Sequence, residues 1–79
     1  MCGFIGLIGF DNVAPSLVLG LQSIQHRGQD AAGAATFDGS RWHLTKDLGM
    51  VSSVLSAERI QDMTGAVGIA HVRYPTAGT

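Results

Sequence analysis

A cysteine stands directly after the initiator methionine in this chain of 79 residues, which begins Met1-Cys2-Gly3. Initiator methionine is normally removed when the second residue is small, so the mature chain would start with a residue that carries both a thiol and a free α-amine. Because an α-amine titrates near neutral pH, it can accept a proton from the thiol and later protonate a leaving group. The arrangement predicts that Cys2 is a nucleophile. The competing interpretation is a small apolar residue at the start of a strand.

The sequence HVRYPTAG at residues 71–78 places a charged side chain where an apolar segment gives way to a loop. The guanidinium of Arg73 could hold a carboxylate through two parallel hydrogen bonds, and the hydroxyl of Thr76 follows shortly after. His71 lies two residues before Arg73, so a strand would present both side chains on one face. A surface arginine before a proline-containing turn would explain the same residues structurally.

The sequence HRGQDAAG at residues 26–33 is a third candidate. His26 and Arg27 suit the end of a helix and Gly28 suits a left-handed cap, so a capped helix followed by a turn explains this motif on its own. The polar pair Gln29-Asp30, directly before a run of small residues, instead favours a loop whose backbone closely approaches another group.

Hydrophobic spacing predicts the elements that must position these residues. Apolar side chains recur at helical intervals after a candidate N-cap, Asp11-Asn12, at positions 13, 17, 21 and 24. Asp38-Gly39 between two apolar segments indicates a hairpin turn. The expected order is a buried strand at 2–9, a helix at 13–24, a hairpin of strands at 32–37 and 41–46, one or two helical turns within 52–63, and a second buried strand at 66–72. We therefore expect an α/β (α+β) fold.

The last expected strand runs straight into a loop rich in Pro and Gly at residues 74–79. Nothing follows in the sequence to pair with this strand or to cover it, and unpaired strand edges invite aggregation. This ending predicts a truncated domain.

Composition and charge narrow the classes of partner. The formal net charge is −1 and the five Lys and Arg residues do not cluster, which gives no electrostatic reason to expect nucleic acid or an anionic membrane. No apolar run approaches the ~20 residues of a membrane-spanning helix, and the N-terminus lacks the positive start of a secretory signal. We expect a cytoplasmic protein.

Neither a disulfide nor a metal site is expected. The chain has one cysteine, which cannot form an internal disulfide or, by itself, a zinc or iron–sulfur site. The three histidines, at positions 26, 43 and 71, have no close paired spacing.

Taken together, the three motifs resemble the class II glutamine amidotransferases, a branch of the N-terminal nucleophile (Ntn) hydrolases. The pattern of that family is an N-terminal Cys-Gly before a buried strand, an HRG or YRG motif after the first helix, and an H-x-R-(Y/W)-x-T-x-G motif at the end of a later strand. All three occur here in that order, over the full length of the chain. Within the family, HRGQDAAG and VRYPTAG look most like the amidophosphoribosyltransferase branch. A relative of glucosamine-6-phosphate synthase and a short non-catalytic module are the alternatives.

The resemblance implies a role for each matched residue. Cys2 would attack the side-chain amide of glutamine, form a thioester and release ammonia, with its own α-amine as acid and base. Arg73 would bind the α-carboxylate of glutamine. The residues implied to form the pocket are Tyr74, Thr76 and Gly78, and those implied to support it are Arg27, Gly28 and His71.

The resemblance also implies that residues 1–79 are the incomplete N-terminal portion of a four-layer α/β/β/α sandwich. An Asn-Gly oxyanion hole would lie beyond residue 79, and loss of one oxyanion donor alone costs about 10²–10³ in rate, so we expect these residues to be inactive by themselves. Ammonia would pass to a downstream phosphoribosyltransferase domain, which would form 5-phosphoribosylamine from phosphoribosyl pyrophosphate in the first step of de novo purine biosynthesis. No cofactor is expected within this chain. Full-length relatives use Mg²⁺ with phosphoribosyl pyrophosphate, some carry an iron–sulfur cluster, and a homo-oligomer is expected.

Overall fold

The computed structural model describes residues 2–9, 11–25 and 29–74. Seven elements follow one another along the chain, and their bounds are β1 Cys2–Ile8, α1 Ala14–Ile24, β2 Ala31–Phe37, β3 Trp42–Leu48, α2 Val51–Val54, α3 Ala57–Ile60 and β4 Val67–Arg73. The mixed α/β fold expected from the sequence is confirmed. None of the described helices is both long and apolar enough to cross a membrane.

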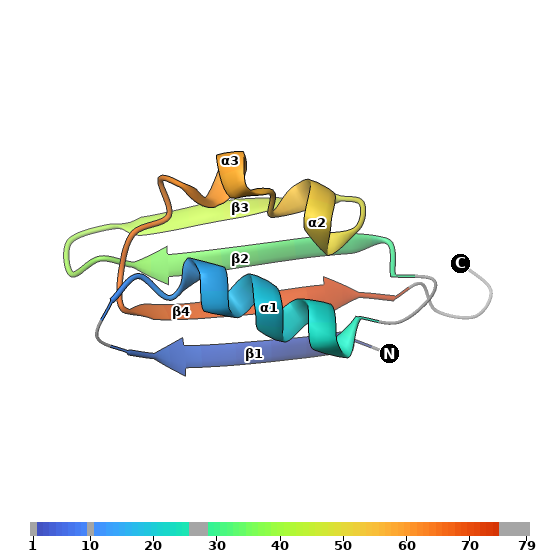
Figure 1. The fold of residues 1–79 in the computed structure, drawn as a ribbon, viewed down its shortest axis with the longest axis horizontal. Coiled ribbons are helices and arrows are strands. Elements are labelled where there is room, and N and C mark those ends of the chain that lie inside the picture. The colour runs from blue at the N-terminus through green and yellow to red at the C-terminus, as the bar shows by residue number, and fades with distance from the viewer. Residues whose placement is uncertain (1, 10, 26–28, 75–79) are drawn as a thin grey trace.

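The strands form one antiparallel sheet in the order β1-β4-β2-β3 (Figure 1). The last strand, β4, therefore lies inside the sheet, with β1 on one side and β2 on the other. The expectation that this strand has nothing to pair with is wrong, because the first strand of the chain returns to it. The hairpin of β2 and β3 is confirmed, although β3 continues to Leu48 through residues expected to be a connector.

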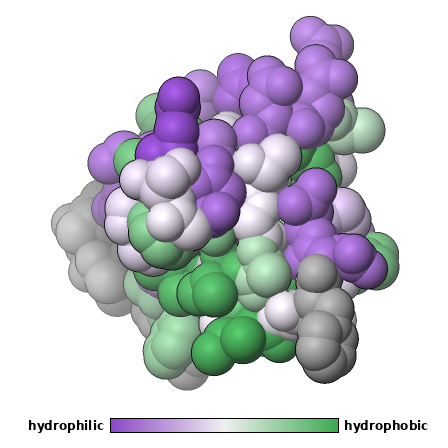
Figure 2. All heavy atoms as spheres, turned by 90° about the vertical axis from the view of Figure 1, so that its left-hand side faces the viewer, coloured by the Kyte–Doolittle hydropathy of each residue, from purple (hydrophilic) through white to green (hydrophobic). Residues whose placement is uncertain are grey.

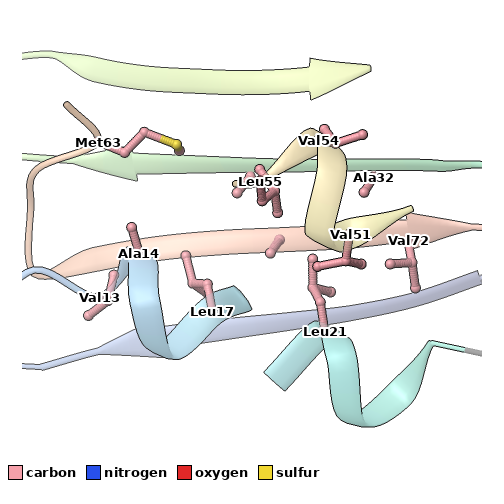
Figure 3. Close-up of a cluster of buried hydrophobic side chains, with 12 residues drawn as sticks. Val13, Ala14, Leu17, Leu21, Ala32, Val51, Val54, Leu55, Met63 and Val72 are labelled. Atoms are coloured by element: carbon pink, nitrogen blue, oxygen red, sulfur yellow. The ribbon is translucent and has the colours of Figure 1, made fainter. Parts of the chain in front are cut away.

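All three helices cover the same face of the sheet (Figure 1). Helix α1 packs on β1 and β4, while α2 packs on β2 and β3. Figure 3 shows the resulting core, in which Leu17 and Leu21 from α1 and Val51 and Leu55 from the α2 region point toward the sheet. The helical stripe predicted from residue 13 onward is thus confirmed, because Val13, Leu17 and Leu21 are buried and Ile24 packs against them.

The opposite face of the sheet is open. Burial alternates along β1 and β4, so that Phe4 is 77% exposed and Ile8 is 85% exposed. Strands β1 and β4 were expected to be buried, and for this face the expectation is wrong. The exposed large apolar side chains on the open face are Phe4, Ile8, Trp42, Leu44, Leu48, Val67 and Ile69. This exceeds the scattered single exposures that are normal on a soluble domain.

Polar and apolar surface separate across the width of the sheet. Figure 2 views the end of the sheet that carries the β2–β3 turn, with hydrophilic surface gathered toward the β3 edge at the top and hydrophobic surface toward the β1 edge below. The edge formed by β3 is therefore the more polar one at this end.

Helix α1 begins differently from the sequence-based expectation. Its N-cap is Val13, with no side-chain hydrogen bond, and not Asp11-Asn12. The side chain of Asn12 is engaged elsewhere, because its Oδ1 accepts a hydrogen bond of 2.9 Å from the backbone N–H of Gly65. Val13 N–H in turn donates to the carbonyl of Gly65 at 2.9 Å. The start of the helix is thus tied to the loop before β4.

Gly65 is required at this junction. Its φ of 128° lies in the region that favours glycine, and a Cβ built there would collide with the backbone carbonyl of Phe37. Gly39, in the β2–β3 turn, also has a positive φ of 100°, but a Cβ there would meet nothing within 4 Å.

This pair gives a matched test of the junction. We predict that Gly65→Ala lowers the free energy of unfolding by about 3 kcal/mol or more, because steric overlap adds to backbone strain. Gly39→Ala carries the strain alone and should cost about 1 kcal/mol. Thermal or urea unfolding of the protein that carries this segment measures both. Equal losses in the two variants would contradict the assignment of Gly65 as a packing constraint.

The β2–β3 turn is organised by the carboxylate of Asp38. Its Oδ1 accepts hydrogen bonds from the backbone N–H groups of Ser40 and Arg41, both at 2.9 Å, and its Oδ2 lies 2.7 Å from Nε2 of His43. The Arg41 N–H, followed by the His43 and Ser40 contacts, holds the pKa of Asp38 well below its usual range.

The lowered pKa of Asp38 predicts a pH dependence with a definite sign. Its contribution to stability should be complete above the unfolded-state pKa of about 3.9 and should be lost as pH falls below that value. Asp38→Asn keeps the shape but cannot ionise, so the stability difference from wild type should be largest near neutral pH and shrink below about pH 4. Asp62→Asn is the matched control for loss of one exposed acid. Unfolding followed from pH 7 to pH 3 tests this, and a difference that grows on acidification would refute it.

Candidate functional site

Cys2 and Arg73 lie directly opposite each other at one end of the sheet. The register pairs Cys2 with Arg73, Arg73 with Ala31, and Ala31 with Leu48 across all four strands. Directly opposed residues of an antiparallel pair share one face, with Cβ atoms about 4.5–5.5 Å apart. Both side chains are exposed, on the face that the helices leave uncovered. The structure therefore joins the first and third sequence motifs into one site.

His71 occupies the next row of the same face. It is paired with Phe4 on one side and Gly33 on the other, and Gly33 is paired with Lys46 of β3. The expectation that His71 and Arg73 share a face is confirmed by the alternating burial of β4. Lys46 was not singled out from the sequence, although the alternation of residues 41–46 could have placed it on this face.

A shallow hollow runs along β2 on the open face. Its floor is formed by small residues, and larger side chains border it; the lining includes Ala31, Gly33, Ala35, Phe4, Leu44, Lys46, Leu48, Ile69, His71 and Arg73. The hollow is mainly apolar, with basic side chains at the end next to Cys2. It suits a small molecule that combines an anionic group with an uncharged part.

Gln29 lies at the same end of the sheet but is buried, with 5% of its surface exposed. Its Nε2 donates to the carbonyl oxygens of Ala31 at 2.7 Å and Gly49 at 2.6 Å. Asp30 follows it, and the Asp30 N–H donates to the carbonyl of Arg73 at 3.0 Å. Among the described residues, Gln29 Oε1 and Asp30 Oδ1 are buried without a hydrogen-bond donor.

Tyr74 turns back toward the helices. Its hydroxyl donates a hydrogen bond of 2.7 Å to the carbonyl of Ile24 at the end of α1, and its ring packs against the core. In this position Tyr74 anchors the end of β4, two residues after His71 has left on the other face. Its expected contribution to the pocket stays a prediction.

Several residues expected in the site lie outside the described part of the chain. These are Arg27, Gly28, Thr76 and Gly78, and their roles stay predictions. Within the described ranges, no three His, Cys, Asp or Glu side chains come together as metal ligands.

Comparison with known proteins gives a consistent result. No family model matches the chain. The chain is 48% identical over 79 residues to an amidophosphoribosyltransferase from Pseudomonas aeruginosa, and 45% identical over 80 residues to one from Methanocaldococcus jannaschii. These matches cover 100% and 99% of this chain, but only 16% and 17% of the two relatives.

Solved structures agree with the sequence relatives. A glutamine phosphoribosylpyrophosphate amidotransferase from B. subtilis, complexed with ADP and GMP, superposes with a TM-score of 0.83 at 32% identity, over 98% of this chain and 17% of that one. A structure described as the allosteric regulatory enzyme of purine biosynthesis gives a TM-score of 0.85 at 34% identity, over 100% of this chain and 17% of that one.

Proposed function

Over its whole length this chain is related to the N-terminal region of amidophosphoribosyltransferases, and from this premise we propose that it supplies the nucleophile and the carboxylate-binding arginine of a glutamine-hydrolysing site. The observation that supports this assignment most directly is the pairing of Cys2 with Arg73 on the open face. Glutamine carries an α-carboxylate and a side-chain amide a few bonds apart. An arginine and a thiol on neighbouring strands match those two groups.

The proposed chemistry begins once Met1 has been removed. The free α-amine of Cys2 takes the proton of its thiol, and the sulfur attacks the amide carbon of glutamine. As the tetrahedral intermediate collapses, the carbon–nitrogen bond breaks and the amine returns a proton, so that ammonia leaves and a γ-glutamyl thioester remains. Water then attacks the thioester, which releases glutamate and restores the thiol.

Arg73 would hold the substrate while these bonds change. Its guanidinium is permanently charged and planar, and it can bind the α-carboxylate of glutamine through two hydrogen bonds. Lys46 and His71, in the next row, add basic character to the same end of the hollow. The apolar lining favours the aliphatic part of the substrate.

The wider assignments follow from the same relationship. We propose that residues 1–79 are the N-terminal portion of a glutamine amidotransferase domain in a longer cytoplasmic enzyme. A downstream phosphoribosyltransferase domain would use the ammonia to form 5-phosphoribosylamine from phosphoribosyl pyrophosphate. The described residues offer no group of metal ligands, so Mg²⁺ and any iron–sulfur cluster would be held elsewhere in the chain. Homo-oligomerisation of the longer enzyme is part of this proposal.

Covalent labelling tests the nucleophile. The full-length protein is treated with an electrophilic glutamine analogue and digested for mass spectrometry. We predict modification of Cys2 in chains that lack Met1, and none in chains that retain it, because the amide nitrogen of an unprocessed Cys2 cannot accept a proton. Cys2→Ser should abolish labelling and reduce glutamine hydrolysis by at least about 10³-fold. Labelling with Met1 in place would sink the mechanism.

Steady-state kinetics test the arginine. Arg73→Ala should raise the KM for glutamine by about 10²-fold, because two charge-assisted hydrogen bonds are lost, while synthesis with added ammonia stays unchanged. Arg73→Lys keeps the charge but not the planar fork, so it should recover only part of the affinity. Arg41→Ala, at the opposite end of the sheet, is the control. An unchanged KM in Arg73→Ala would remove Arg73 from the substrate site.

A further inference from the structure

We propose that Gln29 is a positioning residue of the glutamine site, whose buried amide joins the ends of β2 and β3 and thereby fixes the backbone of Arg73 beside Cys2. The inference rests on the proposed function, since it concerns the geometry of the same site. Gln29 itself touches neither Cys2 nor the hollow in any described contact. It acts through the backbone of its neighbours.

The first step of the argument is the bridge that Gln29 makes. One amide nitrogen donates to Ala31 O at 2.7 Å and to Gly49 O at 2.6 Å. Ala31 opens β2, and Gly49 follows the last residue of β3, so the side chain spans the two strand ends. Because Gln29 is 5% exposed, water cannot readily replace either bond.

The second step carries this bridge to Arg73. Gly49 N–H donates back to the carbonyl of Asp30 at 2.8 Å, which closes a ring of hydrogen bonds around the Gln29-Asp30 segment. Asp30 N–H then donates to the carbonyl of Arg73 at 3.0 Å. A displaced Gln29 would thus move Asp30, and Asp30 holds the last residue of β4.

The third step is the choice of residue. Both carbonyl partners need donors, which only the amide end of glutamine supplies here, while Gln29 Oε1 has no donor among the described residues. Glutamate would place acceptors against acceptors, and methionine has the same length with no donor at all. Gln29→Met therefore removes the bridge and keeps the volume.

Gly49 offers an independent way to disturb the same ring. Its φ is 128°, so Gly49→Ala strains the backbone there, while the added Cβ would only reach ordinary contact with Val54 at 3.4 Å. Gly39→Ala produces the same kind of strain at the opposite end of the hairpin, with a φ of 100° and no neighbour within 4 Å. The two alanine variants form a matched pair that differs in distance from Arg73.

The experiment compares these variants in the full-length protein, with glutamine and with added ammonia as nitrogen source. We expect Gln29→Met to raise the KM for glutamine by about tenfold with kcat within about twofold, because a misplaced binding group weakens substrate positioning. Gly49→Ala should shift KM in the same direction, by about threefold. Gly39→Ala should leave KM unchanged, and ammonia-dependent synthesis should stay at the wild-type rate in all three.

The outcomes separate this inference from the proposed function. If the wild-type protein hydrolyses glutamine and both Gln29→Met and Gly49→Ala keep its KM, the positioning role is refuted. If Gln29→Met does not fold, the Gly49→Ala result decides against Gly39→Ala. An equal loss of glutamine- and ammonia-dependent rates would show a structural role only, and would also overturn the inference. A wild-type protein that lacks glutamine hydrolysis would instead refute the proposed function.

Discussion

The register of β4 between its two neighbours is the constraint on which the rest of this structure depends. Strand β4 exchanges backbone hydrogen bonds with β1 on one side and β2 on the other, and this sets Cys2, Arg73 and Ala31 in one row. Because side chains alternate along a strand, a slip of one residue would turn Arg73 toward the helices and Val72 toward solvent. The burial of Val72 in the core resists that slip. The core on one face thus determines what the other face presents.

The two faces of the sheet play different roles. One is covered by α1, α2 and α3, and its buried side chains supply the hydrophobic stabilisation. The other exposes large apolar side chains together with Cys2 and Arg73. The chain spans only 16% of a relative such as the P. aeruginosa enzyme. Reactive groups and uncovered apolar surface therefore occur on the same side, so whatever buries that surface would also border the site.

Much of this arrangement could be predicted from sequence, and the failures have physical causes. The helical stripe and the Asp38 turn depend on local spacing, and both were found. The exposure of Phe4 was missed because an apolar strand reads the same whether one or both of its faces are covered. Asn12 was taken for a cap because its partner, Gly65, lies 53 residues away. For the same reason the bridge made by Gln29 was invisible, since Gly49 is 20 residues distant.

The strand order also has a consequence for the timing of synthesis. Strand β1 is the first element made, yet its only partner in the sheet is β4, the last of the described strands. Long-range pairing of this kind forms late, because the intervening chain must be present before its ends can meet. During translation the residues around Cys2 therefore wait outside the sheet, open to the enzyme that removes Met1. The topology gives processing a head start over folding, so the amine that the chemistry needs is released before the strand that carries it is locked in place.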